Sequence, residues 1–102
     1  MGLLSRKSES TPQSKVTREL IVVNRLGLHA RPSAMFVKTA SRFKCEIWVE
    51  KDGERVNGKS IMGLMMLAAG PGSTLELRAS GEEADAALDA LAKLVADKFD
   101  ED

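Results

Sequence analysis

The sequence predicts an α+β fold in the order strand, helix, strand, strand, helix, strand, helix (βαββαβα), with helices covering a single face of one sheet. Three observations support this prediction. Short segments alternate apolar and polar residues, which is typical of half-buried strands. Other segments repeat apolar residues at three- and four-residue spacing, which is typical of amphipathic helices. Glycine and proline mark the turns between them, and 102 residues without an internal repeat suit one domain.

Residues 1–15 are polar, rich in Ser, Lys, Thr and Gln. Such a segment buries too little apolar surface to offset the entropy lost on ordering. We therefore expect a flexible N-terminal extension there, followed by a folded domain. Residues 16–23 are extended and β-branched, with an apolar run at their end, and they are predicted to form the first strand.

The first helix is predicted from the turn residues before it and the spacing within it. Gly27 allows a backbone turn, and Pro32 suits the first turn of a helix because it lacks an N–H and has a fixed φ. These signals predict a helix from about Ala30 to Ser41, with His29 at or beside its N-cap. The apolar stripe of this helix comprises Ala34, Phe36, Val37, Ala40 and Phe43.

Two strands joined by a hairpin are predicted next. Residues 45–50 alternate with the two-residue period of a half-buried strand. Asp52-Gly53 is a strong hairpin signal, because both positions of a type I′ turn need a positive φ. The returning strand runs over residues 54–57.

Trp48 is predicted to point away from the core. If Ile47 and Val49 face the core, strand alternation places Trp48 on the opposite side, which no helix covers. We expect Trp48 to join Ile21 or Val23 in an exposed apolar patch there.

The second helix is short and opens after Ser60, a residue type favoured at N-caps. Gly70-Pro71-Gly72 closes it, because glycine accepts the C-cap geometry and proline cannot continue the helix. We expect Leu64 and Leu67 in the core and Met62 on the surface. Its apolar residues at helical spacing are Ile61, Met62, Leu64, Met65 and Leu67.

A fourth strand and a third helix complete the chain. Residues 74–79 alternate again, and Ser80-Gly81-Glu82-Glu83 has the pattern of a capping box. The acidic residues 100–102 oppose the helix dipole at the far end, so we expect that end to fray. The apolar face of the helix comprises Ala84, Ala87, Leu88, Leu91, Leu94 and Val95.

Charge and composition exclude several classes of protein. Fifteen basic and fifteen acidic residues cancel, so no net field attracts nucleic acid or an anionic membrane. No apolar run approaches the ~18 residues of a membrane helix, and we recognise no targeting sequence. The single cysteine, Cys45, excludes an internal disulfide and is expected to be a small buried hydrophobe. These features predict a cytoplasmic protein that neither binds nucleic acid nor inserts into a membrane.

His29, the only histidine, is predicted to lie where an anion is welcome. At a helix start the backbone N–H groups of Ala30 and Arg31 and the positive end of the dipole disfavour an imidazolium, so a neutral ring nitrogen becomes available as a nucleophile. Arg31 adds a fixed charge and donors that match phosphate oxygens. Against this, a lone histidine is more often a capping or packing residue. A metal site is a weaker alternative, because His29 lacks a clustered second ligand.

Leu26-Gly-Leu-His-Ala-Arg-Pro32 closely resembles the phosphorylation-site motif of HPr, the histidine-containing phosphocarrier of the bacterial phosphotransferase system, including its nitrogen-related branch. Lys59-Ser-Ile-Met-Gly63 and Ala79-Ser-Gly81 match further motifs, and the resemblance runs from about Leu20 to Val95. It implies an open-faced sandwich with a four-stranded antiparallel sheet and three helices. It also implies an HPr-like phosphocarrier domain over residues 16–102, with the extension 1–15 as a departure from the family pattern.

The resemblance implies a phosphoryl carrier rather than an enzyme, without cofactor or metal. In the family the histidine accepts a phosphoryl group on Nδ1 from Enzyme I and passes it to an enzyme IIA-type acceptor, and an arginine assists. The matching residues here are His29 and Arg31. Ile61, Met62 and Met65 resemble the apolar patch through which HPr docks its partners. Core packing is the rival reading, and for Met65 the two are evenly matched.

Ser60 matches the serine that HPr kinase modifies, so we expect a regulatory phosphorylation site there and HPr kinase/phosphorylase as a further partner. The alternative is a simple N-cap. A rival function is a non-catalytic regulatory module that binds through Ser60, Ile61 and Met62. Family members of that kind lose the active histidine, which this chain retains. The choice between the sugar-transport and nitrogen-related branches stays open.

Overall fold

The elements of the chain follow the predicted order. The computed structural model describes residues 15–101, and the expected extension 1–15 lies outside this range except for Lys15, which opens the first strand. The elements are β2 (Lys15–Ile21), α1 (Ala30–Ala40), β3 (Glu46–Lys51), β4 (Glu54–Asn57), α2 (Ile61–Met66), β5 (Thr74–Ser80), α3 (Ala84–Ala96) and the short 3-10 helix η2 (Lys98–Asp100).

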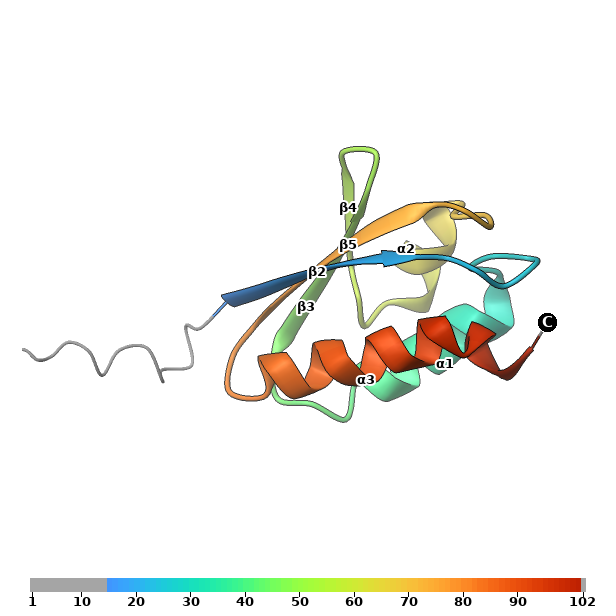
Figure 1. The fold of residues 1–102 in the computed structure, drawn as a ribbon. Helices are drawn as coiled ribbons and strands as arrows, with labels where there is room; N and C mark the ends of the chain where they lie inside the picture. Colours follow the sequence, from blue (N-terminus) through green and yellow to red (C-terminus); the bar gives the residue numbers. More distant parts are fainter. Residues whose placement is uncertain (1–14, 102) are drawn as a thin grey trace, which may run out of the picture.

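Within residues 15–101, four strands form one antiparallel sheet in the order β2-β5-β3-β4. The last strand in the chain, β5, is therefore inserted between β2 and β3. Helices α1 and α3 run along one face of the sheet, and α2 packs against α1 and β4 (Figure 1). The prediction of an α+β open-faced sandwich is confirmed.

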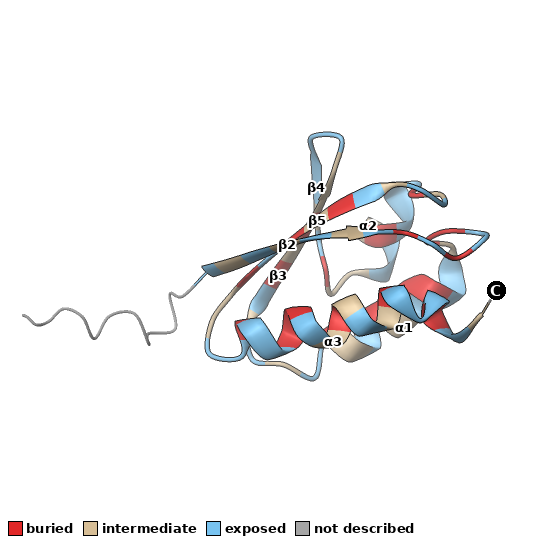
Figure 2. Ribbon diagram, in the orientation of Figure 1, coloured by how far each residue is buried: buried red, intermediate tan, exposed pale blue. Residues whose placement is uncertain are grey.

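Alternation along the strands builds the core. Ile47 and Val49 on β3 are fully or almost fully buried, as are Leu75 and Leu77 on β5. Burial concentrates where sheet and helices face one another (Figure 2). The helices contribute apolar side chains that are less than 2% exposed, among them Phe36, Leu64, Leu88 and Leu91. The helical spacing that predicted these elements therefore reflects real burial against one sheet face.

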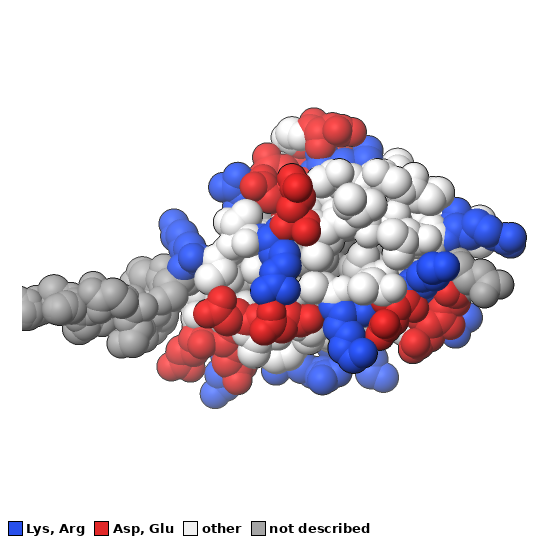
Figure 3. Space-filling view, in the orientation of Figure 1, with Lys and Arg blue, Asp and Glu red and all other residues white. Residues whose placement is uncertain are grey.

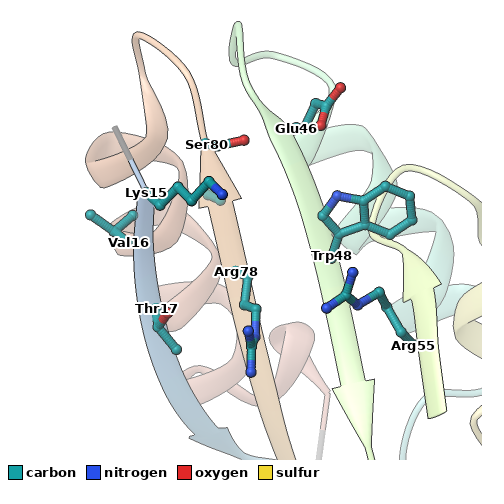
Figure 4. Close-up of a pocket in the computed structure, with 9 residues that line it drawn as sticks. Lys15, Val16, Thr17, Glu46, Trp48, Arg55, Arg78 and Ser80 are labelled. Carbon is teal, nitrogen blue, oxygen red and sulfur yellow. The ribbon is translucent and has the colours of Figure 1, made fainter. Parts of the chain in front are cut away.

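Trp48 lies on the sheet face that no helix of the described residues covers, as predicted. The prediction of an apolar patch around it is wrong. Its cross-strand neighbour is Arg78, and the Arg55 guanidinium lies 5.9 Å from its ring centroid. These side chains line a shallow hollow of about 260 Å³ on that face (Figure 4). Ile21 pairs with Thr74, four residues along β5 from Arg78. Alternation assigns a side chain to a face, whereas register decides its neighbours.

The capping box predicted for α3 is also wrong. Ser80 is the last residue of β5, and the N-cap residue Glu83 makes no side-chain bond to its own helix. Glu83 Oε1 instead accepts a hydrogen bond of 2.6 Å from the Lys44 backbone N–H. This acid therefore ties the start of α3 to the loop before β3.

Two burial predictions need correction. In α1, Ala34 is exposed and Ser33 is fully buried, because the Ser33 hydroxyl finds a carbonyl to which it can donate. Cys45 is only partly buried against the core, and desolvation raises the pKa of its thiol.

Charged side chains of both signs are interspersed on the face seen in Figure 3, as the balanced composition suggests. Among the described residues, no helix is both long and apolar enough to span a bilayer.

Candidate functional site

His29 stands at the start of α1 with its ring free of the helix. It is the N-cap residue, in an extended conformation (φ −78°, ψ −169°), and its side chain makes no cap hydrogen bond. Its backbone carbonyl accepts from Ser33 N at 3.0 Å, so the backbone enters the helix regularly. About a third of the side chain is exposed. The imidazole is therefore held at a helix N-terminus and remains open to a partner.

The loop before His29 is clamped to the segment that follows α2. Leu28 N donates to Ala69 O at 2.9 Å, and Ser33 Oγ donates to Leu28 O at 3.1 Å. Gly27 has φ +68°, and a Cβ at that position would clash with the backbone carbonyl oxygen of Ala69. Only glycine permits this approach. The segment after α2 therefore fixes the position of His29.

Glu101 touches His29, a contact that sequence reasoning missed. Glu101 Oε1 lies 3.1 Å from His29 Nε2 and accepts a hydrogen bond of 2.9 Å from Asn24 Nδ2. The expected fraying of the acidic tail is wrong for this residue, because Phe99 is fully buried and anchors the segment. The sequence offered one signal for this contact: Phe99 is a single aromatic residue in an otherwise charged tail, and such a residue tends to be buried.

The carboxyl group of Glu101 is held in its ionised form. Hydrogen bonds lower its pKa from the ordinary value of 4.5, first that from Asn24 and then that with His29. Desolvation raises it, and the charges of His29 and Arg31 lower it further. An ionised carboxylate only accepts hydrogen bonds, so a hydrogen bond at this contact requires a proton on His29 Nε2. Among the described residues, Nδ1 has no hydrogen-bond partner.

Ala30 and Arg31 form the exposed first turn of α1. Their backbone N–H groups stand where an α-helix has no carbonyl partners for them. The Arg31 side chain makes no ion pair among residues 15–101. This turn therefore offers N–H donors and an unpaired positive charge at the same helix start as the imidazole, and helix N-termini in general favour anions.

The three residues of the predicted docking patch are exposed on α2. Ile61 and Met65 are 42% and 44% exposed, and Met62 is 71% exposed. We call these three residues the α2 patch. Met65 thus takes the surface position left open in the sequence, while Leu64 and Leu67 are buried as predicted.

The α2 patch reaches the histidine through Met65. A hollow of about 300 Å³ is lined by His29 and Met65, together with Leu26, Leu28, Ala68, Ala69 and Gly70. Leu26 is itself 68% exposed. An apolar hollow therefore adjoins the polar start of α1.

Ser60 caps the N-terminus of α2. Its Oγ accepts a hydrogen bond of 3.0 Å from Gly63 N, which is the N-cap geometry predicted for it. The residue is partly exposed. Among the described residues, no group of three or more His, Cys, Asp and Glu side chains could hold a metal ion.

Comparisons with known proteins show the family of the chain. The family described as the PTS HPr component phosphorylation site matches residues 16–97. A phosphocarrier protein HPr from Neisseria meningitidis serogroup A is 54% identical over 80 residues, which are 78% of this chain and 90% of that protein. The HPr-like protein Crh from Halalkalibacterium halodurans is 51% identical over 76 residues, 74% of this chain and 90% of that protein.

The fold is also that of a solved structure. The crystal structure of HPr-C-His from Thermoanaerobacter tengcongensis superposes with a TM-score of 0.82 at 46% identity, and the match covers 85% of this chain and 98% of that chain.

Proposed function

This chain belongs to the family of HPr phosphocarriers of the phosphotransferase system, and we propose that it accepts a phosphoryl group on His29 and passes it on. As a member of that family it is a phosphoryl carrier, not an enzyme. We assign the carrier to residues 16–102, preceded by the extension 1–15, and place its action in the cytoplasm.

The observation that carries the proposal is the uncapped, partly exposed imidazole of His29 at a helix start. Phosphoryl transfer requires a positioned nucleophile and stabilisation of the charge on the transferred group. The imidazole supplies the nucleophile. The N–H groups of Ala30 and Arg31 and the dipole of α1 favour the dianion that results.

Arg31 is proposed to assist through its side chain. It extends from the same turn as those N–H groups, and it is exposed and unpaired among the described residues. A guanidinium donates to two phosphate oxygens at once, which orients as well as stabilises the group. No larger catalytic apparatus is needed on the carrier, because the partners supply the rest.

The proposed partners are Enzyme I as donor and enzyme IIA-type proteins as acceptors. Both must bring a reacting atom to His29, so both must bind beside the start of α1. The α2 patch and the hollow that joins Met65 to His29 supply apolar area there. Flexible methionines suit a surface that adapts to more than one partner.

The direct test is phosphorylation of the wild-type protein by Enzyme I from the same source and phosphoenolpyruvate. We expect one acid-labile phosphoryl group, located on His29 by mass spectrometry. His29→Ala should accept none and keep the circular dichroism spectrum of wild type, because the residue contributes little core area. A wild-type protein that stays unmodified, or a variant that is still phosphorylated, contradicts the proposal.

Ser60 is proposed as a regulatory phosphorylation site for an HPr kinase. A phosphate there gains from the N-terminal end of α2, so the fold should survive. It also places up to two negative charges beside Ile61 and Met62, which penalises any partner that buries them. Phosphoserine should thus weaken Enzyme I binding without altering His29.

This regulation is tested by comparing Enzyme I affinity and transfer rate in the enzymatically phosphorylated protein, Ser60→Asp and Ser60→Ala. The two charged forms should bind more weakly and transfer more slowly than the alanine control. If all three behave alike, or if the cognate kinase leaves Ser60 unmodified, the residue is a helix cap only.

A further inference from the structure

The C-terminal segment is held in an unusual backbone conformation. Lys98, Phe99 and Asp100 have φ values of +58°, +53° and +58°, in the left-handed region that side-chained residues seldom adopt. Each such residue costs free energy and persists only where the surroundings require it. Burial of the Phe99 ring, which is 0% exposed, supplies that requirement. The turn brings the chain back beside the start of α1 (Figure 1).

Asn24 holds the other side of the contact. It is fully buried, and its Nδ2 donates to Gly27 O at 2.8 Å and to Glu101 Oε1 at 2.9 Å. Its own Oδ1 has no partner among the described residues. A buried amide oxygen without a hydrogen-bond partner costs free energy of folding. The Asn24 amide therefore makes its two Nδ2 bonds at a cost to the stability of the protein. The bond to Gly27 O supports the loop before His29, and the bond to Glu101 Oε1 fixes the Glu101 carboxylate.

We propose that Glu101 is a positioning residue that holds the Nε2–H form of the His29 imidazole, so that Nδ1 carries the lone pair that receives the phosphoryl group. The inference rests on the proposed function and deepens it. Its basis is the distance of 3.1 Å between Nε2 and a carboxylate oxygen that is itself fixed by Asn24 and, through the chain, by Phe99. The lowered pKa of Glu101 keeps this oxygen an acceptor.

The same carboxylate stabilises the product of transfer. The Nδ1 lone pair of His29 forms the new P–N bond while the bond from phosphorus to the donor group breaks and returns its electron pair to the donor. The proton stays on Nε2, so the imidazole ring acquires a positive charge as the bond forms. Glu101 then faces a cationic N–H instead of a neutral one, and a charge-assisted hydrogen bond is stronger than a neutral one.

The first experiment reads the tautomer without any phosphoryl donor. Because His29 is the only histidine, long-range ¹H–¹⁵N spectra at mildly alkaline pH contain a single imidazole. We expect wild type to show a protonated Nε2 whose proton exchanges slowly with water. Glu101→Ala should lose that protection and show mixed tautomers, whereas Glu101→Gln should keep it, since an amide oxygen also accepts. Equal protection in wild type and Glu101→Ala would overturn the assignment.

The second experiment measures the rate of phosphoryl acceptance. Glu101→Ala should be slower by roughly tenfold or more, and Glu101→Gln should lie between it and wild type because it keeps the hydrogen bond and loses the charge. The matched control is Asp100→Asn, which removes one negative charge from the neighbouring exposed residue. A control as slow as Glu101→Ala, or equal rates in wild type and Glu101→Ala, would overturn the role of Glu101. The spectra decide that role even if His29 proves to accept no phosphoryl group.

Discussion

Helices α1 and α2 start in opposite ways. Both N-cap residues, His29 and Ser60, have extended backbones. The Ser60 hydroxyl accepts from Gly63 N at 3.0 Å, so α2 is capped from within its own first turn. The His29 ring caps nothing, and its partner is Glu101, 72 residues away. We call the start of α2 closed, because its N-cap side chain bonds to a backbone N–H of its own first turn. We call the start of α1 open, because its N-cap side chain bonds elsewhere and leaves the first N–H groups available to an anion.

The largest effect is expected from removing the Phe99 ring, because the start of α1 depends on the C-terminal segment and the start of α2 does not. Phe99→Ala should lower the free energy of unfolding by about 3–5 kcal/mol, the usual cost of removing a buried phenylalanine ring. It should also release Glu101, so that the Asn24 side-chain amide loses its protection from hydrogen exchange. The Gly63 amide should keep its protection, because its cap is local.

The matched control for this variant is Phe43→Ala, which removes a partly buried ring away from the tail. It should cost stability and leave the Asn24 amide protected. If both variants expose Asn24 equally, or if Phe99→Ala exposes Gly63 as strongly as Asn24, the contrast between the two starts is lost.

A smaller effect is expected from the charge at the open start. Arg31→Ala should slow phosphoryl acceptance by roughly ten- to a hundredfold, the kinetic equivalent of a charge-assisted contact worth about 1.5–3 kcal/mol. Folding should be retained, since the side chain is exposed. Arg42→Ala, an exposed arginine just beyond the other end of α1, serves as the control and should transfer at the wild-type rate. Indistinguishable rates for the two variants would mean that Arg31 takes no part.

The closed start predicts a modest loss of stability. Ser60→Ala removes the acceptor of the Gly63 N–H and should lower the free energy of unfolding by about 1 kcal/mol, as at other N-caps. Chemical denaturation followed by Trp48 fluorescence measures it. A change in the free energy of unfolding near zero would indicate that water replaces the hydroxyl at no cost. The Ser60 cap would then not distinguish the start of α2 from that of α1.

The smallest effect concerns pH. The pKa of Glu101 is depressed in the folded protein, so the carboxylate adds stability above its ordinary value of 4.5 and loses that contribution as the pH falls through the lower folded value. Wild type should therefore melt above Glu101→Gln at neutral pH. The difference in Tm should shrink in acid below that folded value. A difference that is constant across this range would mean that the carboxylate charge contributes nothing to docking the tail.

Local sequence was sufficient for much of the fold. The bounds of β4 agree with the prediction, and α1 and β5 agree to within one residue at each end. These elements depend on periodicity and on turn residues such as Gly53 and Pro32, which act over a few bonds. The predictions failed where a residue interacts with a partner far away in the sequence. Ser80 was expected to cap α3, but the strand pairing of β5 extends through it.

The sequence by itself determined which residues stand at the helix starts. His29, Arg31 and Ser60 occupy the helix starts predicted for them, because caps and first turns are specified by neighbouring residues. Only the tertiary structure decided what completes the site. Glu101 reaches His29 because α3 spans the sheet face and Phe99 turns the chain back into the core, and no local pattern records a contact between residues 72 positions apart.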